Sequence, residues 1–444
     1  MKSGFTEKEL IRIWQRQLLN ADGALTEDGQ PLQIIHPGWL NDGGGPDFKD
    51  AVILIGQELV RGDIEVHLSP DGWFEHGHHL DVAYNRVILH VVMWADDGKP
   101  ARLQNGGEAP TLVLSKYANI PVSQWSVVRS PSAVSTLPCR ETVACLSKET
   151  MAQLLDKAGE ERFLGKARRL QKDLFSLEAG QALYEGIMTA LGYSRNKLPF
   201  LELARRLPLR RLEAKEDCSE TEWLAQKQAL LIGASGLLDA SSVWLERALG
   251  KRQMRKMLKY AAVLTCPEAL PRDAWHLVKV RPNNSPPVRL SAMSHLLQRY
   301  REMGLLEGLL NLVERAPPGR DGPKSLEAGL IVAENGVTLL GKERADEIIV
   351  NVLLPFTFVL SQTNPELGSK AREIYFLYPR LSANSVEAEM TERLGLSTGL
   401  VNSARRRRLN GSLVNSASRQ QGLIHIYKNF CCQGKCNGCA LGQL

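Results

Sequence analysis

Histidine and carboxylate side chains are concentrated in one short part of this sequence. Five of the nine histidines lie near one another: His67, His76, His78, His79 and His90. Asp47 directly follows Pro46, and Glu65 lies two residues before His67. Histidine titrates near neutral pH and is the commonest metal ligand in proteins, so this grouping predicts metal binding or acid–base catalysis.

The carboxylates are expected to meet on a β-hairpin. The runs DAVILI and LVRGDIEVHL have β-strand composition and flank residues 56–58, which predicts two strands and a short connection. If the hairpin turns about Gln57, Asp47 lies across from His67, with Glu65 on the diagonal. The three side chains then share one face of the sheet, because side chains alternate along a strand.

Two carboxylates that converge in this way can bind a hard cation such as Mg²⁺ or Mn²⁺, which polarises a phosphoryl oxygen and activates water. Alternation places Asp63 on the same face as a further candidate metal ligand. His67, His76 or His78 is then expected to activate the attacking water. Local hydrogen bonding is the simpler explanation for Asp63 itself and for three other polar residues nearby: Asp81, His79 and His90.

Pro46-Asp47, the hairpin and Glu65-Val66-His67 together resemble the signature of PD-(D/E)XK nucleases. The resemblance implies a restriction-endonuclease-like α/β domain in which Asp47 and Glu65 bind the metal. In that family a lysine two positions after the glutamate orients the attacking water, and His67 occupies that position here. Either the histidine supplies this role, or the domain binds metal without cutting nucleic acid.

Three functions therefore remain open. The first is a metal-dependent nuclease that uses Asp47 and Glu65 with Mg²⁺ or Mn²⁺ and a histidine in place of the lysine. The second is a catalytically inactive, nuclease-derived module for nucleic-acid binding or assembly. The third is a metallohydrolase whose Zn²⁺ or Mn²⁺ is bound by the histidine cluster instead.

Nearly the whole chain also resembles an uncharacterised bacterial domain-of-unknown-function family. The matching segments are GPDF, GDIEVH, HGHH, YNRVILHVV, ALGYSRNKLPF, VRPNNSPPVRL and IYKNFCCQGKCNGCALG. This resemblance implies that the successive parts of the chain form one protein, and it implies no activity.

A second candidate site lies near the C-terminus, where four of the eight cysteines occur in the last fourteen residues. Cys436 and Cys439 have the Cys-x2-Cys spacing that lets two thiolates bind one tetrahedral metal. Cys431 or Cys432 can supply a third ligand. Candidates for the fourth are the remaining cysteine of that pair, His425, Cys139 and Cys145. We expect a zinc ion or an iron–sulfur cluster at this site.

A metal shared with Cys139 would fasten the C-terminal segment to the first domain. Some helicase-associated and CRISPR-adaptation nucleases of the PD-(D/E)XK class resemble this arrangement, because three late cysteines and one distant cysteine bind an iron–sulfur cluster. In those proteins the distant cysteine precedes the nuclease motifs, whereas Cys139 follows them.

The elements that must hold these groups follow from the hydrophobic pattern. Thr6 to Glu9 fit a capping box, and apolar residues at helical spacing predict an amphipathic helix over residues 6–19. RVILHVVMW predicts a strand buried on both faces, and TLVLSKY another strand. From about residue 147 the apolar spacing becomes helical.

The sequence thus predicts an α+β, mainly α protein. A nuclease-like α/β domain with a mixed sheet is expected over residues 1–135, a helical domain over 136–420 and a cysteine-rich tail over 421–444. The proline-rich segments RPNNSPPVRL and APPGRDGPKS are interpreted as connections, which places Arg289 in a loop with Asn283 and Asn284.

A nucleic-acid partner is expected from the basic residues, which give a net charge of +6 and cluster after residue 160. Residues 385–410 have the pattern of a helix-turn-helix. Its second helix would end in Arg405, Arg406, Arg407 and Arg408, which are candidates for phosphate contacts. The N-terminus lacks a signal-peptide pattern and no apolar run reaches eighteen residues, so we expect a cytoplasmic protein without membrane contact.

Overall fold

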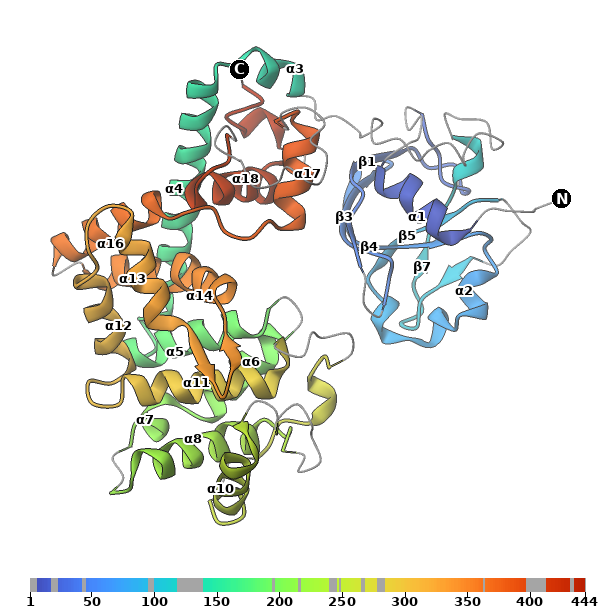
Figure 1. The fold of residues 1–444 in the computed structure, drawn as a ribbon. Coiled ribbons are helices and arrows are strands. Elements are labelled where there is room, and N and C mark those ends of the chain that lie inside the picture. The colour runs from blue at the N-terminus through green and yellow to red at the C-terminus, as the bar shows by residue number, and fades with distance from the viewer. Residues whose placement is uncertain are drawn as a thin grey trace. The chain divides into compact units, whose positions relative to one another are not determined.

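The chain forms two compact units. The computed structural model describes residues 6–16, 23–41, 45–94, 100–117, 139–193, 196–214, 217–238, 246, 249–264, 268–277, 284–361, 364–396, 413–431 and 435–443. The first unit comprises Met1–Met151, Asn384–Leu413 and Leu423–Leu444, and the second comprises Ala152–Ala383 and Val414–Gly422. The predicted fold class is confirmed, because a mixed sheet is followed by a large helical region (Figure 1).

The sheet of the first unit has the strand order β1-β3-β4-β5-β8, and β2 pairs with the start of β3. The strands are β1 (Leu32–His36), β2 (Trp39–Leu40), β3 (Phe48–Ile55), β4 (Glu58–His67), β5 (Val87–Val92) and β8 (Thr111–Val113). Neighbours from β1 to β4 are antiparallel, whereas β5 and β8 run parallel to β4. The predicted strands in RVILHVVMW and TLVLSKY are therefore confirmed.

Helix α1 (Glu7–Arg16) packs on one face of this sheet (Figure 1, blue). One of the two hydrogen bonds of the predicted capping box is present, because the Thr6 backbone nitrogen donates to Glu9 Oε2 at 2.9 Å. Leu10, Ile13 and Trp14 are buried in one core with the β4 residues Ile64 and Val66. Each such aliphatic side chain contributes about 1.5–3 kcal/mol of hydrophobic stabilisation. Since strand side chains alternate, the residues between them face the opposite side of the sheet.

The register of the β3–β4 hairpin differs from the prediction. The turn consists of Gly56 and Gln57 alone, so Ile55 pairs with Glu58. Continued unbroken, this register would put Asp47 and Glu65 on opposite faces, because a one-residue slip reverses every side chain. A β-bulge between Phe48 and Ala51 adds one residue to β3 and restores their common face, so that Phe48 pairs with Ile64.

Asp50 is the residue that lets the strand bulge. Its φ of 56° lies in the left-handed region, which aspartate tolerates better than most residues. Its backbone nitrogen donates to Asp63 Oδ1 at 3.1 Å. The predicted pairing of Asp47 with His67 is wrong. When the register is continued one residue beyond the Phe48–Ile64 pair, Asp47 lies across from Glu65.

The connection from β4 to β5 joins two parallel strands and must therefore cross over one face of the sheet. It contains α2 (Gly72–Glu75) and two 3-10 turns, His78–Leu80 and Val82–Tyr84. A small ribbon of β6 (Ala101–Arg102) and β7 (Glu108–Ala109) helps to bury Trp73 beneath this crossover. The crossover brings its histidines back to the carboxyl end of β4.

The C-terminal segment belongs to the first unit. That unit also contains the 3-10 turn Leu114–Lys116, α3 (Arg140–Cys145), α17 (Ser385–Arg393), the second half of α18 (Ala417–Asn429) and the 3-10 turn Cys436–Gly438. The Tyr427 hydroxyl contacts His36 Nε2 at 2.7 Å, which ties α18 to β1. This division differs from predicted boundaries at residues 135 and 420. Helix α17 matches the first helix of the predicted helix-turn-helix, and the second lies outside the described residues.

The second unit is almost entirely helical and has one extensive hydrophobic core. Its elements are α4 (Lys148–Asp173, which begins in the first unit), α5 (Ala179–Leu191), α6 (Lys197–Arg206), α7 (Leu209–Leu212), α8 (Glu220–Ala234), α10 (Lys251–Ala261), the 3-10 turn Arg272–Ala274, α11 (Pro286–Arg299), α12 (Leu305–Glu314), α13 (Asp321–Leu330), β9 (Val332–Glu334), β10 (Val337–Leu340), α14 (Lys342–Ile348), the π-helical turn Ile349–Leu353, α15 (Leu354–Leu360) and α16 (Pro365–Leu377). Among the described helices, none combines the length and apolar character that a membrane span requires.

Candidate metal centre

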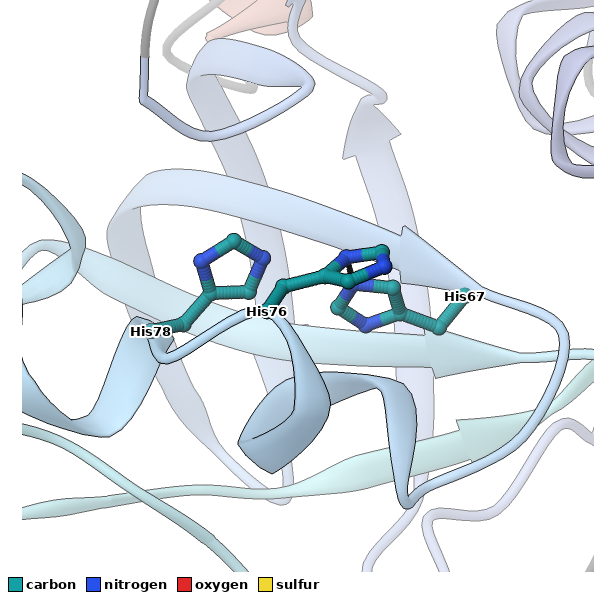
Figure 2. A group of neighbouring side chains, drawn as sticks. All are labelled: His67, His76 and His78. Carbon is teal, nitrogen blue, oxygen red and sulfur yellow. Dashed lines mark hydrogen bonds between the residues drawn. The ribbon is translucent and has the colours of Figure 1, made fainter.

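Three histidines converge at the carboxyl end of β4. His67 is the last residue of the strand, and His76 and His78 follow α2 in the crossover (Figure 2). One nitrogen of each ring lies within 4.8 Å of the others, and no other such group of ligand atoms occurs in the described part of the chain. His67 and His78 are buried, whereas His76 is exposed, so the cluster is open to solvent on the His76 side.

Glu65 belongs to the same cluster. Its Oε1 lies 3.1 Å from His78 Nε2 and 3.5 Å from His67 Nε2, and that His67 nitrogen lies 3.1 Å from His76 Nδ1. Three imidazoles therefore gather here, and the Glu65 carboxylate lies beside two of them, His67 and His78. This donor set suits Mn²⁺ or Zn²⁺ better than Mg²⁺, which prefers oxygen ligands and bound water.

Asp47 lies beside Glu65, as the shared face requires. The Asp47 backbone nitrogen donates to Glu65 Oε2 at 2.9 Å, and the Val66 backbone nitrogen donates to Asp47 Oδ2 at 3.2 Å. These two bonds fix both carboxylates against the sheet. The carboxylate pair and the histidine cluster, which the sequence suggested as alternative sites, form a single site.

His90 supports His67 from the neighbouring strand. Its Nε2 contacts His67 Nδ1 at 2.8 Å. If Nδ1 of His67 carries the proton, its Nε2 lone pair faces His76 and Glu65, which is the orientation that a metal ligand needs. Gly72 leaves room for this ring, because a Cβ at that position would lie 2.9 Å from the ring of His67.

The electrostatics of the site favour a cation. Burial, reinforced by the negative charge of Glu65, raises the pKa of Asp47 to about 7, and burial raises the pKa of Glu65 to about 8. Burial also lowers the pKa of His67 to about 2 and that of His90 to about 3. At neutral pH the carboxyl pair thus retains a proton while His67 and His90 are neutral. A divalent cation can replace that proton and bind both the carboxylates and the imidazoles.

Sequence reasoning missed three contributors to the site. His90 had been interpreted as structural, although its place on the strand paired with β4 gave a signal. Tyr84 stacks on His78 with ring centroids 3.8 Å apart. Glu7, in the first turn of α1, adds negative charge that raises the pKa of Asp47 and Glu65. The position of Glu7 relative to this site could not be predicted, because it depends on how α1 packs on the sheet.

Asp63 interacts with other groups. Its carboxylate accepts the hydrogen bond from Asp50, and the charges nearest to it include those of Arg86 and Lys49. Burial raises its pKa. Asp63 therefore lies at the bulge, where its hydrogen bond with Asp50 supports the register that aligns Asp47 with Glu65. Asp63 is not among the metal ligands that we propose.

The cysteines form a second, looser group. The thiol of Cys431 interacts electrostatically with Cys139, Cys436 and Cys439, and burial together with these neighbours raises its pKa to about 12. Burial, followed by the charge of Cys439, likewise raises the pKa of Cys139. The described sulfurs do not meet the 4.8 Å spacing of the histidine cluster. Cys432 and Arg405–Arg408 lie outside the described residues, and their roles stay predictions.

Fold and site together define a protein with a mixed-sheet domain, a histidine–carboxylate cluster of metal-ligand type and a large helical region. The chain belongs to the family of proteins of unknown function designated DUF2851, whose model matches residues 7–312. No curated protein and no solved structure matches the chain. The predicted family resemblance is therefore confirmed, whereas the resemblance to PD-(D/E)XK nucleases is not.

Proposed function

We propose that this protein is a metal-dependent hydrolase that cleaves phosphodiester bonds of nucleic acid. The observation that carries the proposal is the gathering of the ligand atoms of His67, His76 and His78, with the Glu65 carboxylate beside His67 and His78. The preferred metal is Mn²⁺ or Zn²⁺, because three of the four ligands are imidazoles.

The bound metal would polarise a phosphoryl oxygen and lower the pKa of a coordinated water. Asp47 is the group that we assign as general base, because it adjoins the metal ligand Glu65 and its pKa of about 7 is close to the working pH. His67, at the position that a lysine occupies in PD-(D/E)XK nucleases, acts as a metal ligand in this scheme. His90 positions His67 and touches no substrate.

The test is cleavage by the full-length protein of plasmid, linear duplex and single-stranded DNA and of RNA, with Mn²⁺, Zn²⁺ or Mg²⁺. We expect cleavage with Mn²⁺ or Zn²⁺ that Glu65→Gln abolishes. Glu58→Gln is the matched control, because Glu58 lies on the same strand but is exposed at the hairpin turn. Absence of cleavage with every metal would reject the hydrolase. Salt-sensitive binding without cleavage would then support the inactive nucleic-acid-binding module.

We also propose that the C-terminal cysteines and Cys139 bind a zinc ion or an iron–sulfur cluster. Support comes from the mutual interactions of Cys139, Cys431, Cys436 and Cys439, which join segments far apart in the sequence. A metal would draw their sulfurs together and lower their pKa values, since only thiolates bind it. Metal analysis of the purified protein separates zinc from iron, and a brown colour would indicate the cluster.

A further inference from the structure

Two arginines of the helical unit meet on one tyrosine ring. Arg344, in α14, places its guanidinium carbon 3.2 Å from the ring centroid of Tyr193, and Arg289 places its own 5.5 Å away. Arg289 is only 4% exposed. It lies in the first turns of α11, so its predicted place in a loop is wrong. Tyr193 lies in the segment ALGYSRNKLPF, and Arg289 lies in VRPNNSPPVRL.

The partners of Arg289 are all uncharged. It donates to the Leu339 carbonyl at 2.7 Å, to the Tyr193 hydroxyl at 2.9 Å and to Asn284 Oδ1 at 2.5 Å. Burial, and then the charge of Arg344, lowers the pKa of Arg289. Uncompensated charge in a protein interior is costly, because water no longer solvates it.

Arg344 has no carboxylate partner either. Its Nη1 donates to the Ala190 carbonyl at 3.1 Å. Within the described ranges, neither Arg289 nor Arg344 forms an ion pair with any Asp or Glu. Other arginines of this unit do so: Arg419 binds Asp156 at 3.1 Å, and Arg205 binds Glu185 at 3.1 Å.

Three buried polar atoms at this place have no hydrogen-bond partner among the residues that the structure describes. They are Nε of Arg289, Nε of Arg344 and Oγ of Ser285. Ser285 is the N-cap of α11, so the positive end of the helix dipole lies at the same point. Unsatisfied buried donors in a native fold commonly mark an absent ion or water. Positively charged donors that gather without an anionic partner indicate that the ligand is an anion.

We propose that Arg289 and Arg344, with Ser285 at the start of α11, bind a phosphate group. Guanidinium groups donate paired hydrogen bonds that match phosphate oxygens, and helix N-termini bind phosphate through the same dipole. The phosphate can belong to a free anion or to a polynucleotide backbone. This inference does not depend on the metal centre, because it concerns a separate set of residues.

The test is calorimetric titration of the full-length protein with inorganic phosphate at constant ionic strength, repeated with a short single-stranded oligonucleotide. We expect saturable phosphate binding that Arg344→Gln weakens about tenfold or more, because it removes a charge-assisted contact. Arg372→Gln is the matched control: Arg372 also lies over an aromatic ring, that of Phe376, but is paired with Glu160. The control should bind phosphate as the unmodified protein does.

Arg344→Gln is the main variant because Arg344 is only partly buried, and a circular dichroism spectrum checks its fold. Competition between phosphate and the oligonucleotide would assign the site to a polynucleotide backbone, and phosphate binding without competition would assign it to a small anion. Both outcomes support the site. No saturable binding of either probe, or equal binding by the folded Arg344→Gln protein, would overturn it.

Discussion

The histidine–carboxylate cluster and the cysteine group are both candidate metal sites of the first unit, yet they are organised differently. The cluster comes from residues 47–90 and is held on adjacent strands and one crossover, with its ligand atoms already gathered. The cysteines come from residue 139 and from the C-terminal segment, and their sulfurs are more widely spaced.

The fold positions the ligands of the histidine–carboxylate cluster, whereas a metal bound by the cysteines would itself stabilise the fold. The sheet pairing and the hydrogen bonds of Glu65 and His67 hold these two side chains, so metal there is expected to serve chemistry. The cysteines lie at the start of α3, just after α18 and at a 3-10 turn, in segments that a shared metal would join, so metal there is expected to stabilise. The predictions below test that separation.

The largest effect is expected from removing one ligand of the cluster. We expect His78→Asn to lower the Mn²⁺-dependent cleavage rate by about 10³-fold, because the electrostatic stabilisation of the transition state is lost with the metal. His79→Asn is the matched control, since the His79 ring contacts Phe74 in a tilted arrangement and lies outside the cluster. It should change the rate by less than about twofold. Equal losses in the two variants would contradict the assignment.

For the cysteine group, stability is expected to change instead. Cys439→Ser should remove the zinc or iron and cost about 2–4 kcal/mol of stability around the C-terminal segment, because a bound metal stabilises only the folded state. Hydrogen exchange of residues 413–443 measures this, and Mn²⁺ binding at the histidines should persist. Cys218→Ser is the control, because Cys218 lies in the helical unit. Unchanged metal content in Cys439→Ser would show that the cysteines bind none.

Metal affinity should depend on pH in a defined direction. The raised pKa values of Asp47, about 7, and Glu65, about 8, mean that the metal-free site holds protons below these values. Metal displaces them, so Mn²⁺ affinity should rise by up to about a hundredfold per pH unit below pH 7, where both carboxyls are protonated, by about tenfold between pH 7 and pH 8, and level off above pH 8. His67, with a pKa of about 2, stays neutral throughout.

The stability of the metal-free protein should follow the opposite trend. Below about pH 6.5 the extra protons that the folded state holds on Asp47 and Glu65 are offset by those that only the unfolded chain binds at His67 and His90. Above about pH 6.5 only the carboxyl pair differs, so stability falls between about pH 6.5 and pH 8. Thermal unfolding with and without Mn²⁺ should diverge most at pH 8. An affinity that does not change with pH would show that the carboxyl pair is not displaced by metal.

The smallest effect tests the bulge. Asp50→Val should cost about 1–2 kcal/mol, because a β-branched residue is strained at a φ of 56°, whereas Asp50→Gly should be tolerated there. Both variants lose the exposed contact of Asp50 with Arg86, which is 3.4 Å long and contributes little. Urea unfolding compares them, and equal stability would remove the strain argument.

The sequence predicted the elements of the fold well and their register poorly. Periodicity located α1, the hairpin and the buried strand β5 because those patterns are local. The common face of Asp47 and Glu65 was predicted, but from an incorrect register. The two-residue turn and the bulge, neither of which was predicted, each move Asp47 to the opposite face of the sheet relative to Glu65. Their effects cancel, so the two side chains still share a face. No residue pattern before Asp50 revealed the bulge.

Contacts between distant segments could not be predicted from periodicity. Placing His76 and His78 beside His67 requires the path of the crossover, and placing Arg289 beside Tyr193 requires the packing of α11 against the end of α5. The proximity of Cys139 to the late cysteines was one of several alternatives, because spacing specifies a ligand pair and not its distant partner.

A crystal structure of the full-length protein soaked in Mn²⁺, with anomalous scattering to locate the ion, tests the central claim most directly. The account predicts one strong peak bound by Glu65, His67 and His78, with His76 completing the set from the solvent side. A peak at Asp63, or an empty cluster in crystals that bind Mn²⁺ elsewhere, would contradict it.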